Sequence, residues 1–307
     1  MRLWTTVFAG TPEWYFQTQL DAMARPKRHQ TLVAVDGGRI VSSVHYFVRP
    51  TRRLDGTVHK VGGIANVATF EDCRKQGHSG KLLEMSIDKM ADDGCAWSLL
   101  GTGVNRHYER YGWKTIKARY REGTLAESAA HDSSWTVLPI VPGDHDGWWK
   151  PLARIYDTFN AKRPLTLVRD QKHWEIVMLA RLNAPGTVAY VAWPEEGCEP
   201  VGYAVARTDD KSLNLMEVAA MPDATGVLPA MLDVVRELAV HRGSKTILAN
   251  VPFEPAVNSA LLRLMKAPRI CVHTGLMARS LRNDFTIDEV ERAFSTDGPH
   301  VWQLDDF

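Results

Sequence analysis

Cysteine is scarce in this chain, and the few cysteines lie far apart. Only four occur in 307 residues, Cys73, Cys95, Cys198 and Cys271, and no two form a C-x-x-C pair. Neither a disulfide framework nor a cysteine zinc site is indicated, and we predict no metal. Long apolar runs are also missing. VLPAMLDVV, at 227–235, falls far short of the ~20 residues that span a bilayer.

The beginning of the chain lacks the apolar core of a signal peptide. Met1 is followed by RLWTTVFAG, in which apolar residues do not form a continuous stretch of the required length. Together with the unpaired cysteines, this predicts a cytoplasmic protein with reduced thiols and no membrane partner.

The net charge is nearly neutral but unevenly distributed. Residues 1–122 hold 19 Lys and Arg against 12 Asp and Glu, a balance of +7, whereas residues 123–307 hold 18 against 24, a balance of −6. A basic first half favours an anionic ligand. Nucleic-acid-binding proteins usually carry a larger excess, so we predict a compact polyphosphate ligand and no nucleic acid. Uneven surface charge without any partner is the alternative.

Apolar periodicity predicts an α/β (α+β) fold. In the first half we predict a hairpin at 31–48, a buried strand at 61–69, a helix from 79 to about 93, a strand at 96–102, a short helix at 105–110 and a strand at 114–122. After a polar linker at 127–135, the same order recurs: a hairpin at 186–208, a strand at 213–223, a helix at 226–243 and a strand at 245–252. We therefore predict two copies of one fold, each a mixed twisted sheet flanked by helices.

The last 25 residues form a separate tail. FTIDEVERAF contains a Thr286/Glu289 capping box and predicts a helix, and HVWQLDDF predicts a strand-like end.

The turn CRKQGHSGKLL, at 73–83, is where an anion would bind. It follows a strand and opens a helix, whose first N–H groups have no intrahelical partner. It is not a P-loop, because Lys75 replaces the first glycine and Leu82 the hydroxyl, and the G-x-G-x-x-G pattern fails as well. GHSG matches a G-x-x-G RNA clamp, but such a clamp follows a helix.

RKQGHS, at 74–79, resembles the R/Q-x-x-G-x-G/A motif of the GCN5-related N-acetyltransferase (GNAT) family, with Ser79 in place of the last Gly or Ala. NRHYERYGW, at 105–113, resembles the family's Y-E-(K/R)-x-G-(F/W) segment. The layout as a whole is similar to tandem GNAT enzymes of the enhanced intracellular survival (Eis) type. The second copy lacks the motif, since ATGVLPAML stands where the motif would be.

The resemblance implies a place for each part of acetyl-CoA. The backbone of Val67, Ala68 and Thr69 would pair with the pantetheine arm. The pyrophosphate would bind the amides of Lys75, Gln76, Gly77, His78, Ser79 and Gly80. Arg74 or Lys75 would meet the 3′-phosphate. Asn105 would either contact the pantetheine or turn the chain.

The resemblance also implies an acid and a base. Tyr108 matches the tyrosine near the coenzyme sulfur, and a tyrosine with an ordinary pKa of ~10 is protonated at pH 7. Enzymes of the Eis type end in Phe and place the terminal carboxylate in the active site, so Phe307 is the candidate base. His45, His78 and His107 are alternatives.

These inferences predict three segments: an N-terminal GNAT domain at 1–126, which binds acetyl-CoA and is catalytic, a GNAT-like domain without the motif at 136–282, and a tail at 283–307 that reaches the active site. The predicted function is transfer of an acetyl group to a primary amine of a small molecule, aminoglycoside-like or lysine-like, which Asp305 and Asp306 would attract. A non-catalytic CoA-binding module and a protein lysine acetyltransferase are the alternatives, and homo-oligomerisation stays open. The resemblance further implies a first strand and helix before TPEWYF, where only ten residues stand.

Overall fold

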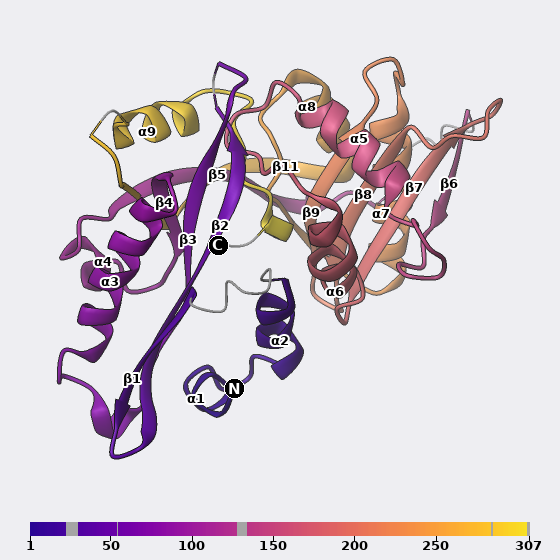
Figure 1. The fold of residues 1–307 in the computed structure, drawn as a ribbon. Helices are drawn as coiled ribbons and strands as arrows, with labels where there is room; N and C mark the ends of the chain where they lie inside the picture. The colour runs from indigo at the N-terminus through magenta and orange to yellow at the C-terminus, as the bar shows by residue number, and fades with distance from the viewer. Residues whose placement is uncertain (23–29, 54, 128–133, 284, 306–307) are drawn as a thin grey trace.

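The computed structural model describes residues 1–22, 30–53, 55–127, 134–283 and 285–305. Their strands form one continuous sheet of eleven strands with helices packed against it (Figure 1), in the order β1-β2-β3-β4-β11-β5-β10-β9-β8-β7-β6. The mixed α/β architecture is as predicted. In the described ranges, no helix is both long and apolar enough to cross a membrane.

The first half of the sheet follows the predicted order. Its elements are β1 (Thr31–Asp36), β2 (Arg39–Arg52), β3 (Val58–Thr69), α3 (His78–Asp92), β4 (Cys95–Gly101), α4 (Asn105–Glu109) and β5 (Lys114–Leu125). The helical spacing noted in the sequence buries Leu83 and Met90 of α3 against Ile64 of β3 and Leu100 of β4. This apolar layer holds α3 against the sheet and fixes the position of its N-terminus.

The second half contains the predicted hairpin, strands and helix together with further helices. Its elements are β6 (Trp135–Pro139), α5 (Lys150–Asn160), η3 (His173–Met178), α6 (Leu179–Leu182), β7 (Thr187–Pro194), β8 (Gly202–Thr208), β9 (Ser212–Ala220), α7 (Val227–His241), β10 (Thr246–Ala249) and α8 (Pro255–Leu264). Most of the predicted linker lies outside the described residues. Its last residue, Trp135, belongs to β6.

One long strand, β11 (Met265–Ser280), has no counterpart in the sequence prediction. It lies between β4 and β5 and runs antiparallel to both, with Met277 opposite Leu100 and Thr115. Met277 is completely buried in the same apolar cluster as α3. A segment late in the chain therefore completes the sheet that the first half begins, and β5 in turn pairs with β10.

The N-terminal segment differs from the implied strand and helix. Residues 1–22 contain two helices, α1 (Arg2–Val7) and α2 (Glu13–Ala22), and no strand. Trp4 and Phe16 pack with Phe70, which directly follows β3. The two helices are thus held at the end of β3 that leads into the basic turn.

The tail differs from prediction in two details. The helix is present as α9 (Ile287–Ser295) with Thr286 at its N-cap, but no side chain caps it, and Glu289 pairs with Arg53 instead. The predicted strand-like end is wrong: residues 303–305 form a 3-10 turn, η4 (Gln303–Asp305). The turn forms because Asp305 bends back into a buried ion pair, described below.

Candidate functional site

The turn before α3 presents free backbone amides. Gly77 is the N-cap residue with φ +82°, and no side chain caps the helix. The first N–H groups of a helix lack intrahelical acceptors and lie at the positive end of its dipole. A Cβ at Gly77 would meet nothing within 4 Å. Glycine is thus needed for its backbone angle, and the space over the amides is open to an anion.

Gly80 serves packing rather than ligand access. A Cβ at this position would collide with the hydroxyl of Tyr111. Gly80 is buried in the first turn of α3, whereas Lys75, Gln76 and Gly77 of the same turn are exposed. The predicted anion-binding turn therefore has one side that packs against Tyr111, at Gly80, and one exposed side, at residues 75–77.

β3 and β4 separate just before this turn. They pair in parallel only from Lys60 to Ile64, and β3 then continues to Thr69 without a β4 partner. Asn66 sits at the point of separation with φ +50°, and its side-chain amide donates to Gln19 of α2. The backbone of residues 67–69 therefore has an open edge beside the turn, as an added strand would require.

The predicted basic side chains surround the exposed rim of the turn. Arg74 Nε donates to the Thr69 carbonyl oxygen at 3.4 Å, and His78 contacts Gln76 at 3.3 Å. Lys75 has φ +64°, a strained angle for a residue with a side chain, so the turn imposes its conformation on this cation. Cys73 is buried, and burial raises the pKa of its thiol, so it is not an activated nucleophile.

Tyr108 lies on α4, the short helix that follows the end of β4. It is buried on α4 with its ring edge-on to Trp113 at 6.2 Å. Burial raises the pKa of its hydroxyl. A hydrogen bond with the Thr102 side chain lowers the same pKa and offsets part of this rise. Thr102 directly follows β4. The Tyr108 hydroxyl is thus kept protonated beside Thr102, at the end of β4.

The side chain of Asn105 is already engaged. Its Nδ2 donates to Thr115 Oγ1 at 2.7 Å and to the Thr274 carbonyl oxygen at 2.8 Å. Both donors are used to join α4 to β5 and β11. Asn105 was expected either to contact the pantetheine or to turn the chain, and these contacts favour the second role.

A buried charge cluster anchors the tail. Asp305 Oδ1 accepts from Arg169 Nε at 2.7 Å, and its Oδ2 accepts from the Tyr156 hydroxyl at 3.2 Å. The two Nη atoms of Arg169 donate to both oxygens of Glu217 at 2.8 and 2.6 Å. Asp305 is therefore not available to attract a cationic substrate, which corrects that expectation. Asp306 and the predicted base Phe307 lie outside the described residues.

The charges of this cluster are set by their partners. Burial alone would raise the pKa of Asp305, but the Arg169 guanidinium and the hydrogen bond with His173 outweigh it and hold that pKa well below its usual range. Burial lowers the pKa of His173 to about 4, so it is neutral. Burial raises the pKa of Glu217, against the opposing effect of Arg169. Arg169 and Asp305 thus form an ion pair two residues before the C-terminus.

Of the alternative bases, His45 is buried beside Thr31 Oγ1, at 3.0 Å from its Nδ1. Burial lowers the pKa of His45 to about 4, and burial also lowers the pKa of His107. His78 is only partly buried and lies in the turn itself.

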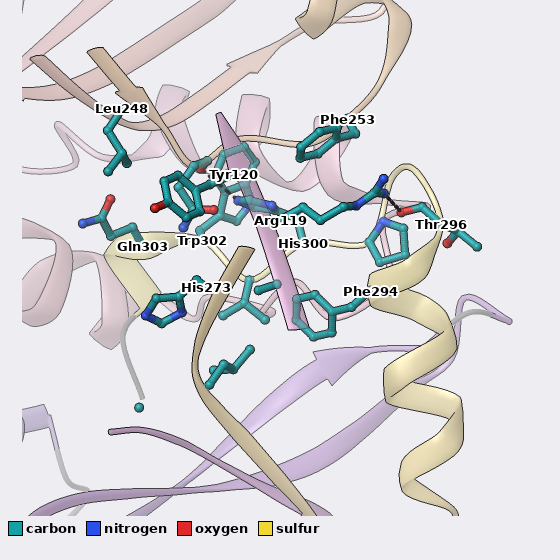
Figure 2. Close-up of a pocket in the computed structure, with 16 residues that line it drawn as sticks. Arg119, Tyr120, Leu248, Phe253, His273, Phe294, Thr296, His300, Trp302 and Gln303 are labelled. Carbon is teal, nitrogen blue, oxygen red and sulfur yellow. Dashed lines mark hydrogen bonds between the residues drawn. The ribbon is translucent and has the colours of Figure 1, made fainter. Parts of the chain in front are cut away.

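A cavity of about 410 Å³ lies where the two halves of the sheet and the tail meet (Figure 2). β5, β10 and β11 supply one wall, and the end of α9 with residues 299–303 supplies the other. Gly101, the last residue of β4, also lines it. The cavity therefore adjoins the strand end that carries Thr102.

Several residues that build this region were not singled out by the sequence analysis. Asn66 and Gln19 meet across 47 positions, and Arg169 meets Asp305 across 136 positions. The one signal in the sequence is Arg169 itself, a cation beside the apolar stretch LTLV. In the part of the chain that the structure describes, no group of three or more His, Cys, Asp or Glu residues could hold a metal ion.

Residues 1–116 match the family model of the acetyltransferase (GNAT) domain. Solved structures share the fold over nearly the whole chain. A probable N-acyltransferase from Enterococcus faecalis V583 has a TM-score of 0.68 at 17% identity, covering 92% of this chain and 69% of that one. Eis1 from Mycobacterium abscessus has a TM-score of 0.60 at 15% identity, covering 91% and 69%.

A tandem GNAT protein from the clavulanic acid biosynthesis pathway has a TM-score of 0.53 at 11% identity, covering 90% of each chain. No curated protein sequence matches this chain significantly. The likeness to these structures shows a tandem GNAT fold, as predicted.

Proposed function

Because residues 1–116 match the family model of the acetyltransferase (GNAT) domain, we propose that this chain transfers an acetyl group from acetyl-CoA to a primary amine of a small molecule. The observation that carries the proposal is the open backbone edge of residues 67–69, which leads directly into the uncapped N-terminus of α3. An extended arm that ends in a pyrophosphate fits this pair of features, since the edge offers strand-like hydrogen bonds and the helix offers free amides.

Each residue of the site has a defined task in this proposal. Residues 67–69 bind the pantetheine arm, and the amides of residues 75–80 bind the pyrophosphate, with Arg74 and Lys75 near the 3′-phosphate. The acetyl group arrives as a thioester, which an amine can attack. Residues of this chain then have two protons to move.

The proton balance assigns these two tasks. A C–N bond forms and the C–S bond breaks, so the sulfur takes an electron pair and a proton, and the amine gives up a proton. Tyr108 donates to the sulfur, because burial keeps its hydroxyl protonated. The terminal carboxylate of Phe307 accepts the proton of the amine, since the Arg169–Asp305 ion pair anchors the tail two residues earlier.

The second half of the chain binds no coenzyme in this proposal. At the position equivalent to the basic turn it also has a glycine N-cap, Gly226 with φ +87° at the start of α7. However, Val227 and Leu228, the first residues of that helix, are both buried. This helix start is packed rather than open, so the second half shapes the site and anchors the tail.

A coupled assay tests the proposed function. Purified full-length chain is mixed with acetyl-CoA and a panel of amines that includes an aminoglycoside, lysine, a lysine peptide and arylalkylamines. Thiol release is followed with a thiol reagent, and mass spectrometry identifies the acetylated product. Release with at least one amine is expected. CoA binding by calorimetry without any turnover would instead support the non-catalytic module.

A product confined to the lysine peptide would support the protein acetyltransferase. The cytoplasmic location and the assembly into homo-oligomers stay predictions.

A further inference from the structure

The cavity in Figure 2 has no acidic residue among the sixteen that line it. Its aromatic side chains are Tyr120, Phe253, Phe294 and Trp302, accompanied by Leu248, Leu276 and Val301. Its volume of about 410 Å³ is in the lower part of the range for small-molecule sites, roughly 300–1,000 Å³. A compact, largely apolar molecule matches such walls.

Two basic side chains of the wall, Arg119 and His300, are engaged by other groups of the protein. Arg119 donates to Asp297 Oδ1 at 3.2 Å and to the Thr296 carbonyl oxygen at 3.0 Å, and its guanidinium lies over the Phe253 ring at 4.5 Å. Burial lowers the pKa of His300 to about 3, and its neutral ring contacts the Asn250 carbonyl oxygen at 3.1 Å. Among the described residues that line the cavity, no carboxylate side chain is present to balance a molecule with several positive charges.

One acceptor in the wall has no partner. The Oε1 atom of Gln303 is buried, and it makes no hydrogen bond within the described residues. A buried oxygen without a hydrogen bond lowers stability by about 1–3 kcal/mol, so a ligand that donates a hydrogen bond to it would be favoured. Gln303 and His273 lie on one side of the cavity, and Phe253 and Phe294 on the other (Figure 2). The cavity thus has a polar end that needs an N–H donor and an aromatic end.

The polar end is the end nearer the proposed chemistry. Gln303 stands two residues before the anchored Asp305, and Gly101 directly precedes Thr102, whose side chain bonds the Tyr108 hydroxyl. An amine donating to Gln303 would lie next to the segment that leads to the proposed base.

Resting on the proposed function, we propose that this cavity binds the acetyl acceptor, and that the acceptor is a primary amine carried by an aromatic or flat apolar body. Its N–H groups donate to Gln303 Oε1, and its ring packs against the apolar side chains that line the rest of the cavity. A polycationic aminoglycoside is a poor acceptor in this site, because the described lining residues offer no acidic side chain for each of its charges as these lose water.

The substrate test compares tryptamine with kanamycin and lysine in the thiol-release assay. We expect kcat/KM for tryptamine to exceed that for kanamycin at least tenfold. Binding of tryptamine, read from quenching of tryptophan fluorescence in the presence of CoA, should be stronger than binding of 3-ethylindole, which keeps the ring and lacks the amine. Equal or better turnover of kanamycin would overturn the proposal.

Two variants locate the site. Ala118→Phe adds a ring to the wall on β5, and Gln303→Leu removes the acceptor oxygen at similar size. Each should raise KM for tryptamine about tenfold and leave the CoA dissociation constant unchanged. The matched control is Val33→Phe, which adds a ring to the separate cavity of about 640 Å³ between α1, α2 and the β1–β2 hairpin. It should leave KM unchanged.

The outcomes separate this proposal from the function on which it rests. If the chain binds no CoA and acetylates no amine, the proposed function fails and takes the acceptor site with it. If an amine is acetylated but both site variants leave its KM unchanged, or if Val33→Phe alone raises it, only the acceptor site is wrong. If CoA binds without turnover, weaker tryptamine binding in both variants still supports the cavity, and unchanged binding refutes it.

Discussion

Replacing Arg169 with methionine tests whether the buried charge cluster holds the tail. The guanidinium is fully buried between the carboxylates of Glu217 and Asp305, which are also buried, with side-chain exposures of 0%, 0% and 1%. Arg169→Met removes the positive charge that contacts both carboxylates. Both anions, or the protons needed to neutralise them, would remain inside the protein.

The expected loss is large on the scale of a whole domain. Removing one partner of a buried pair costs about 3–5 kcal/mol, because the charge that remains has neither water nor a counter-ion. The total free energy of unfolding of a domain is only about 5–15 kcal/mol. Arg169→Met should therefore lower the free energy of unfolding by about 3–5 kcal/mol.

A triple variant separates the unpaired charge from lost packing. Arg169→Met combined with Glu217→Gln and Asp305→Asn removes all three charges and keeps similar shapes, so it should recover at least about 2 kcal/mol of the loss. Urea unfolding followed by tryptophan fluorescence measures both, with the exposed Arg207→Met as the control. A single variant within 1 kcal/mol of the parent chain, or a triple variant less stable than the single one, would refute the reasoning.

Four further predictions concern the site and the fold. Tyr108→Phe should lower kcat about 10²-fold or more with unchanged CoA affinity, because it removes the proposed acid and keeps the ring; unchanged kcat in the thiol-release assay would argue against this role. Deleting Phe307 should lower kcat at unchanged melting temperature, and full activity would remove the tail carboxylate from the mechanism. Gly77→Ala should weaken CoA binding, measured by calorimetry, and destabilise the turn by about 1–2 kcal/mol because φ is +82°; unaltered CoA affinity would contradict the predicted anion-binding turn. His45 and His173 have pKa values lowered to about 4, so in acid the unfolded chain binds protons that the folded chain does not. The free energy of unfolding should therefore fall as pH drops from about 6.5 to about 4, by up to ~1.4 kcal/mol per pH unit for each histidine. Urea midpoints that do not change with pH in this range would contradict this prediction.

The sequence was a good guide wherever neighbouring residues decide the structure. The turn and α3 follow from Gly77 and from the spacing of Leu83 and Met90, which reports one buried helix face. The hairpin of β1 and β2 follows from Asp36 and the two glycines after it. In each case a local pattern and a local turn suffice.

β11 escaped prediction because its sequence carries no strand pattern. Ile270 and Val272 are 64% and 53% exposed, and Ala267 has φ +47°, so neither alternation nor continuous burial is visible. The strand exists because two distant edges, β4 and β5, lie ready to pair with it. A single sequence does not reveal such edges.

The end of the tail shows a second kind of failure. HVWQLDDF alternates apolar and polar residues like a strand, yet the Asp305 carboxylate turns inward to Arg169. A contact between residues 136 positions apart decides the shape of this segment. Contacts between distant residues, such as Asn66 and Gln19, also build the region of the predicted site. The turn at 73–83 was visible in the sequence, whereas the cavity and the anchor of the tail were not.

The position of β11 has a consequence for the order in which the protein can be made. While the ribosome is still synthesising the second half, β4 and β5 have left the exit tunnel with the edges that β11 will later join unpaired. Open strand edges readily pair with other chains. The first half must therefore wait for about 140 further residues, from the end of β5 at Leu125 to Met265 and beyond, before its sheet can close. A fragment that ends near residue 126 would keep these open edges permanently and should aggregate rather than fold.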